Sequence, residues 1–147
     1  MDNLRLSLED FLPYRLNRLA DDVSLRFSAL YKKRFGMTRP EWRLLATLGQ
    51  YGTMTATEIG KHSSMHKTKV SRAVASLEER RWLERRNSPD DKRVEHLELS
   101  KAGERAYKEL VPLARDFEAR LLDHLSEKDR ETVLAGLALL ERVALRD

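Results

Sequence analysis

The stretch "TATEIGKHSSMHKTKVSRAVASLEERR", residues 55–81, decides the fold of this chain. It opens with the capping box "TATE", which predicts a short helix that runs to about His62. Two serines then interrupt the pattern, and we expect Ser64 to cap a second helix within residues 65–81. Two helices joined by so short a turn predict a helix-turn-helix.

The second helix of this stretch has two unlike faces. Its apolar side chains gather in one arc and predict a buried stripe, formed by Val70, Ala73, Val74 and Leu77. The opposite arc is narrow and polar, and it contains Thr68, Lys69, Ser71, Arg72, Ala75 and Ser76. The first thirteen residues from Met65 include three cations, a histidine and no acid. Such a face fits a groove about 12 Å wide, although a basic helix face is often simply solvated.

The flanking segments add helices and a hairpin. Apolar residues at steps of three and four predict a long helix that begins near Asp10 and is ended by Gly36. The sequence "TRPE" begins a second helix, which Gly52 closes. Beyond Trp82, alternating residues on both sides of "SPDDK" predict two short antiparallel strands with a basic tip. Ser100 then caps a long helix, and "SEKD" begins the last one.

Composition supports a mainly helical domain. The chain has 147 residues, of which 35% are charged and 7% aromatic, with six glycines and four prolines. This balance favours one domain built of long solvated helices. The absence of cysteine excludes disulfides and thiolate chemistry. Because the N-terminus is polar and no run of eighteen apolar residues is present, we expect a soluble, cytoplasmic protein without a membrane span.

The net charge of +4 is concentrated in one part of the chain. The segment Lys61–Lys101 has eleven lysines and arginines against seven acids, whereas the other residues hold seventeen of each sign. The excess coincides with the helix-turn-helix and the hairpin, and together these signals predict nucleic-acid binding. Free N–H groups at the start of the second helix would attract phosphate near Ser64, His66, Lys67 and Thr68.

Two other patterns could indicate a different chemistry. His62 and His66 are four residues apart, a spacing that can bind a metal ion, but the serine turn places them on different helices without a third ligand. Asp90 and Asp91 resemble an acid–base pair, but they lie in a turn beside basic residues with no nucleophile nearby. We expect no metal, no cofactor and no enzymatic activity, and we interpret His66 as a DNA contact.

The order and spacing of these elements resemble the MarR (multiple antibiotic resistance regulator) family of winged helix-turn-helix regulators. The likeness covers nearly the whole chain. Its most specific part is the wing, where Asp91 and Arg93 match the family's Asp-x-Arg signature and "LSKAG" follows at the family's spacing. The resemblance implies a single MarR-like domain, mainly α with a small β-hairpin wing. This domain would span residues 1–147. It would consist of a winged helix-turn-helix region at 38–100 and dimerisation helices at 1–35 and 101–147.

The resemblance also implies roles for individual residues. In this family the second helix of the motif enters the major groove, and the wing arginine reaches the adjacent minor groove. Carried over by position, the contacts to base edges or nearby phosphates are made by Thr68, Lys69, Ser71 and Arg72. Arg93 then lies at the wing tip with Asp91 as its support, while Lys67 and Lys92 contact phosphates.

The chain departs from the family pattern in the turn between the two helices. Ser63 and Ser64 replace a common leucine and glycine, so the turn lacks its usual αL glycine and one apolar contact. We expect Gly60, where alanine is common, to compensate by allowing a closer helix contact.

A single helix and wing cover only a half-site, so specific affinity requires a dimer. The last helix has a wide apolar arc, made of Val133, Leu134, Leu137, Leu140 and Ala144 with Leu139, Val143 and Leu145 beside it. A helix that is apolar on several sides is buried on several sides. The alternatives are burial within its own domain and burial against a second copy, and the resemblance implies the second.

The sequence and the resemblance predict a sequence-specific DNA-binding transcriptional regulator, a ligand-responsive repressor that binds a pseudo-palindromic operator as a homodimer. The family implies a small aromatic or phenolic acid as the effector. Trp42 could stack on its ring and Arg43 could pair with its carboxylate, although Trp42 also suits the core. The alternative function is a constitutive accessory or architectural DNA-binding protein with no effector.

Overall fold

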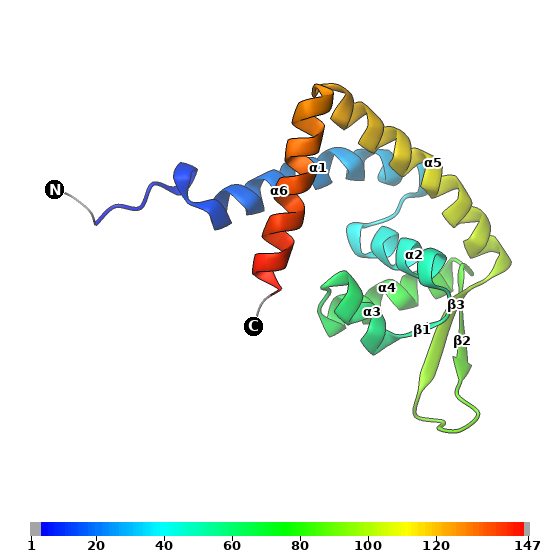
Figure 1. Ribbon diagram of the computed structural model, residues 1–147. Helices are drawn as coiled ribbons and strands as arrows, with labels where there is room; N and C mark the ends of the chain where they lie inside the picture. The colour runs from blue at the N-terminus through cyan, green and yellow to red at the C-terminus, as the bar shows by residue number, and fades with distance from the viewer. Residues whose placement is uncertain (1–3, 146–147) are drawn as a thin grey trace. The chain divides into compact units, whose positions relative to one another are not determined.

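A computed structural model describes residues 4–145 of the chain (Figure 1). Residues 1–3 and 146–147, the outer ends of the expected dimerisation segments, lie outside it. The described part is mainly helical with one small sheet, which confirms the expected fold class. Its elements are η1 (Leu8–Asp10), α1 (Leu12–Phe35), α2 (Arg39–Tyr51), β1 (Met54–Thr55), α3 (Ala56–Ser63), α4 (Lys67–Glu79), β2 (Leu83–Asn87), β3 (Glu95–Leu99), α5 (Lys101–Asp123) and α6 (Glu127–Ala144). Packing divides the chain into two compact units, Met1–Leu113 and Ala114–Asp147.

The first two helices begin and end close to where the sequence predicts. Gly36 adopts the αL conformation, with φ at 67°, and ends α1. Thr38 caps α2, because its hydroxyl oxygen accepts from the Glu41 backbone N–H at 3.4 Å and donates to Glu41 Oε1 at 3.0 Å. An aromatic cluster joins the two helices, and it consists of Phe27, Tyr31 and Trp42.

The helix-turn-helix consists of α3 and α4, as the sequence predicts. Thr55 caps α3 by accepting a hydrogen bond from the Glu58 backbone N–H at 3.2 Å. The predicted apolar stripe of α4 faces the core, since all four of its members are buried: Val70, Ala73, Val74 and Leu77. This stripe packs α4 against α2 and α3, so the opposite face is turned outward.

The expectation that Ser64 caps α4 is wrong. Ser64 instead closes α3, in the αL conformation with φ at 53° and its N–H bonded to the Gly60 carbonyl. The serine therefore takes the place of the αL glycine, and Met65, which is buried, supplies the apolar contact. A Cβ on Gly60 would lie 3.4 Å from the Met65 carbonyl oxygen. That is ordinary contact distance, so the helices come no closer there than alanine would allow.

The wing belongs to a sheet of three antiparallel strands in the order β1-β3-β2. The sequence predicts β2 and β3, whose register pairs Leu83 with Leu99 and Asn87 with Glu95. It does not predict β1, a two-residue strand in which Met54 pairs with Leu97. So short a segment shows no periodicity, and its extended form depends on pairing with β3. Figure 1 shows the β2–β3 hairpin projecting beyond the helix-turn-helix.

α5 begins in close contact with the base of this hairpin. The Ser100 hydroxyl donates to the Arg81 carbonyl at 2.6 Å and accepts from the Gly103 N–H at 3.1 Å, so Ser100 caps α5 as predicted. Gly103 lies against Trp82 so closely that a Cβ would be 2.0 Å from the Trp82 carbonyl oxygen. The glycine of "LSKAG" therefore has a steric role. α5 continues through Pro112.

In the second unit, Ser126 caps α6 by accepting from the Asp129 N–H at 3.1 Å, again as predicted. Arg130 joins α6 to the end of α5 through the Leu122 carbonyl and the Asp123 carboxylate. No helix in the described part of the chain is long and apolar enough to cross a membrane.

Candidate nucleic-acid interface

The outer face of α4 presents polar and basic side chains. Thr68, Lys69, Ser71 and Arg72 are all exposed, opposite the buried stripe. None of these four side chains forms a hydrogen bond or an ion pair with another residue between 4 and 145. Two cations and two hydroxyls thus project from a helix whose other side is held by the core. This combination can contact base edges and phosphates in a major groove.

The N-terminus of α4 has no side-chain cap. His66 occupies the N-cap position without a capping hydrogen bond, and the first turn contains no acid. The backbone N–H groups of this turn therefore keep their partial positive charge beside the exposed Lys67. Such a terminus attracts phosphate. Ser64 is exposed at the other end of the turn, where α3 closes.

The wing tip between β2 and β3 is organised by Asp91. Its Oδ1 accepts from the Arg93 backbone N–H at 3.0 Å and lies 3.4 Å from the Arg93 guanidinium. The tip is closed by the Ser88 N–H, which donates to the Val94 carbonyl at 2.9 Å. The Arg93 side chain is 93% exposed, and Lys92 is exposed beside it. The tip therefore presents two cations on a constrained turn.

The arginines at the base of the wing pair with glutamates of neighbouring elements. Arg85 on β2 donates to Glu78 of α4 at 2.7 Å and to Glu95 of β3 at 3.1 Å, and these bonds raise the pKa of its guanidinium. Arg86 bonds to Glu98 on the neighbouring strand, which lowers the pKa of that carboxyl. These cations stabilise the sheet and its contact with α4. The sequence counts them in the basic excess but cannot show that they are paired.

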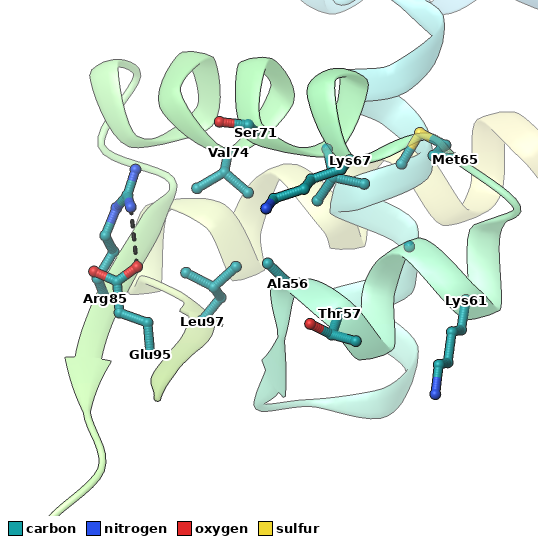
Figure 2. Close-up of a pocket in the computed structure, with 12 residues that line it drawn as sticks. Ala56, Thr57, Lys61, Met65, Lys67, Ser71, Val74, Arg85, Glu95 and Leu97 are labelled. Atoms are coloured by element: carbon teal, nitrogen blue, oxygen red, sulfur yellow. Dashed lines mark hydrogen bonds and ion pairs between the residues drawn. The ribbon is translucent and has the colours of Figure 1, made fainter. Parts of the chain in front are cut away.

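A cavity of about 490 Å³ lies between α3, α4 and the sheet. Figure 2 shows Lys67 and Ser71 of α4 on one side, Thr57 and Lys61 of α3 on another, and the Arg85–Glu95 pair at the strand edge. Its lining mixes apolar side chains with cations that also border the outer face of α4. A molecule in this cavity would therefore lie beside the residues expected to contact DNA.

The proposed effector residues lie elsewhere, near the start of α2. Trp42 is half-buried and packs edge-on against Phe27, with ring centroids 5.1 Å apart, and beside Tyr31 at 5.8 Å. Arg43 is half-buried on the next position. Burial raises the pKa of Tyr31, and the charges of Arg39 and Arg43 act against that rise. Both arginines are therefore close enough to influence the Tyr31 hydroxyl.

The two histidines do not form a metal site with their surroundings. His62 on α3 lies 2.7 Å from the Tyr51 hydroxyl and packs against its ring. His66 is in the turn before α4. Within residues 4–145, no group of three histidine, aspartate or glutamate side chains is arranged to hold a metal ion.

The chain is similar to known regulators in sequence. Residues 35–94 match the sequence model of the MarR family. YwoH of Bacillus subtilis, an uncharacterized HTH-type transcriptional regulator, is 33% identical over 97 residues, which are 66% of this chain and 70% of YwoH. The HTH-type transcriptional repressor MdtR of Bacillus subtilis is 24% identical over 123 residues, which are 77% of this chain and 79% of MdtR.

A solved structure shares the fold as well. The MarR family transcriptional regulator SPO1453 of Silicibacter pomeroyi DSS-3 superimposes with a TM-score of 0.82 at 28% identity, over 95% of this chain and 99% of SPO1453. These relatives are transcriptional regulators, not enzymes.

Proposed function

Because this chain belongs to the MarR family of DNA-binding transcriptional regulators, we propose that it binds a pseudo-palindromic operator in double-stranded DNA as a homodimer and represses transcription until an effector releases it. This activity belongs in the cytoplasm, where the DNA is. The supporting observation is the outer face of α4, which is basic, unpaired among the described residues and held from behind by the core.

On this face, Arg72 and Lys69 would make the base or phosphate contacts that need charge, and Thr68 and Ser71 those that need a hydroxyl. The uncapped start of α4, with Ser64, His66 and Lys67, would hold a backbone phosphate. These contacts would place the helix in the groove with its acid-free end first. Glu78 and Glu79, the only acids of α4, lie at the opposite end.

The wing would contact the neighbouring minor groove. Arg93 is one of the two exposed cations at the tip, and the deeper negative potential of a narrow minor groove favours an arginine there. Asp91 would support it by fixing the backbone of the tip. Lys92 would contact a phosphate. The DNA-binding region would thus span 38–100.

The segments outside that region would form the dimer. α6 contains no buried residue in the single chain, and its large apolar side chains Val133, Leu134, Leu137, Leu139 and Val143 are between 41% and 68% exposed. On α1, Leu12, Leu16 and Leu19 are also exposed. So much exposed apolar surface calls for a partner, and a second copy would bring two recognition helices to one operator.

The effector would be a small aromatic or phenolic acid. DNA binding by BpsR of Bordetella bronchiseptica, which shares the fold with a TM-score of 0.73 at 18% identity over 86% of this chain and 98% of BpsR, is regulated by 6-hydroxynicotinic acid. In this chain, a cavity of about 380 Å³ at the start of α2 is lined by Tyr31, Lys32 and Arg39 among others. The buried Tyr31 hydroxyl makes no well-aligned hydrogen bond in the described chain, although Ser28 and Trp42 lie beside it. Trp42 would support this wall, and Arg43 would add positive charge for a carboxylate.

Selection of bound sequences from a random pool of double-stranded DNA tests the proposal. A homodimeric reader should enrich two inverted half-sites whose centres lie about one helical turn apart. Enrichment of no motif, or of a single unpaired motif, would contradict it. Addition of a panel of small aromatic acids to the selected complex then tests the effector, because an unresponsive complex would favour a constitutive accessory protein.

A further inference from the structure

Arg80 lies where the ends of three helices meet. It follows the last residue of α4, and its own backbone N–H closes that helix on the Ser76 carbonyl. Its side chain leaves α4 and reaches the end of α1. There Nη1 donates to the Phe35 carbonyl at 2.7 Å, and Nη2 donates to the Gly36 carbonyl at 2.9 Å.

The same guanidinium also meets the start of α2. Nη2 lies 3.2 Å from Oε2 of Glu41, in an ion pair whose side chains are only 29% and 9% exposed. The other oxygen of Glu41 accepts from the Thr38 hydroxyl within the α2 capping box. Oε2 accepts no well-aligned hydrogen bond from the described residues, so Arg80 is the compensating charge for that oxygen.

An aromatic side chain completes the site. The guanidinium carbon of Arg80 lies 5.0 Å from the centre of the Trp82 ring, and Trp82 packs edge-on against Phe35 with centroids 6.3 Å apart. The last carbonyls of a helix are unpaired and partially negative. The planar fork of an arginine presents separate nitrogens in a fixed geometry to two of them and a carboxylate, whereas the ammonium group of a lysine is a compact point charge on a flexible stem.

We infer that Arg80 is a positioning residue that fixes the angle between α1 and the recognition helix α4. α1 carries exposed apolar side chains suited to a dimer contact, and α4 carries the face suited to DNA. A rigid joint between them would set how far apart the two recognition helices of a dimer stand. The role of Arg80 in spacing the two recognition helices rests on the proposed function. The joint, which is the contact of Arg80 with Phe35, Gly36 and Glu41, is a property of one chain.

The joint can be measured without DNA. Because the chain has no cysteine, Lys33→Cys on α1 and Ala75→Cys on α4 introduce two unique, exposed labelling sites. Double electron–electron resonance between spin labels on these two cysteines gives the distance distribution within one chain, if the labelled protein is diluted with unlabelled protein. We expect a narrow distribution in the parent and a broadened or shifted one in Arg80→Gln. Arg81→Gln is the matched control, since it removes the neighbouring charge but touches neither α1 nor Glu41, and it should retain the parent's distribution.

Two milder variants distinguish a change in the angle between the helices from a loss of the fold. Arg80→Lys retains the charge but loses the fork, and Glu41→Gln retains the capping box but loses the ion pair. Both should broaden the distribution at a temperature where circular dichroism shows them folded. If Arg80→Gln and Arg80→Lys are folded and give the parent's distribution, Arg80 does not position α4.

In DNA binding, the Arg80 variants should lose the preference for one spacing between the two operator half-sites. Operator duplexes taken from the selection, with the two half-sites moved together or apart by one or two base pairs, should be discriminated by the parent. In Arg80→Lys this discrimination should fall on the order of tenfold. A merely structural role would lower the melting temperature and weaken all spacings equally, which would overturn the inference. If the parent selects no paired half-sites, the proposed function fails, while the distance measurement still decides whether Arg80 fixes the joint.

Discussion

Replacing Gly103 with alanine should destabilise the protein through one steric contact. Gly103 is buried in the first turn of α5. An added Cβ would lie 2.0 Å from the Trp82 carbonyl oxygen, 2.9 Å from its carbonyl carbon and 3.2 Å from the Leu99 Cβ. Trp82 precedes β2 and Leu99 ends β3, so the new methyl group would press on both ends of the hairpin. A backbone carbonyl cannot rotate away as a side chain can.

The size of the effect follows from what must move. Relief to an ordinary C···O contact requires a shift on the order of 1 Å, which would strain two hydrogen bonds of Ser100. These bonds join its N–H to the Trp82 carbonyl at 2.9 Å and its hydroxyl to the Arg81 carbonyl at 2.6 Å. Each is worth about 1 kcal/mol, and overpacking adds about 1–3 kcal/mol. Alanine favours the helix by about 1 kcal/mol relative to glycine, so the free energy of unfolding should fall by about 2–4 kcal/mol in total.

Chemical denaturation at one fixed protein concentration measures this loss, because the stability of the proposed dimer would depend on concentration. Gly60→Ala is the matched control, since its Cβ would meet the Met65 carbonyl at 3.4 Å and alanine favours the helix. It should leave the free energy of unfolding unchanged or raise it by up to about 1 kcal/mol. If Gly103→Ala behaves like Gly60→Ala, the close contact between α5 and the hairpin is not as described.

Three further predictions concern the turn after α4 and the wing. Arg81 has φ at 63°, so Arg81→Gly should raise the free energy of unfolding by up to about 1 kcal/mol in urea denaturation, and a loss would show that its side chain stabilises the fold. Arg86 lowers the pKa of Glu98 below its ordinary 4.5 in the folded state, so the stabilisation is present above that pH and is lost as the pH falls through the folded pKa. The stability difference between the parent and Glu98→Gln should therefore narrow below pH 4.5, and a constant difference would contradict this. Arg93→Ala should weaken DNA binding and reduce the slope of log K against log salt by about 1, whereas an unchanged slope would place the wing off the DNA.

The parts of the fold that depend on local chemistry could be predicted from the sequence. Capping boxes need only residues three apart, and Thr38, Thr55 and Ser126 all cap the helices that they were expected to cap. The buried stripe of α4 follows from helical periodicity, and each of its members is in the core. Local hydrogen bonds and the period of apolar residues therefore account for most element boundaries.

The parts that depend on distant residues could not be predicted. Ser64 can start one helix or close another, and the burial of Met65 after it goes with the second arrangement. β1 is extended because it pairs with β3, more than forty positions away in the chain. Position 103 must be a glycine because a side chain there would meet Trp82, and no spacing rule connects these two residues in the sequence.

The sequence also could not show which basic residues of the candidate site are paired with acids. The sequence locates the basic excess but treats all its members alike. The structure separates the arginines that pair with glutamates of other elements, such as Arg80 and Arg85, from cations on α4 and the wing tip that do not. Of these, Arg72 is exposed, and Arg93 contacts only Asp91 of its own turn among the described residues. Which acid lies within reach of each arginine is a property of the folded chain, so this division needed the structure.

If the outer face of α4 reads DNA sequence, the exposed Arg72 should specify a base. Selection from the same random pool of double-stranded DNA should be carried out in parallel with the parent and with Arg72→Ala. We predict that the variant's consensus loses its preference at one base in each half-site, symmetrically, at a cost of about 1–3 kcal/mol for the parent's preferred base, while the other positions and the half-site spacing persist. An Arg72→Ala consensus identical to the parent's at every position would show that Arg72 reads no base.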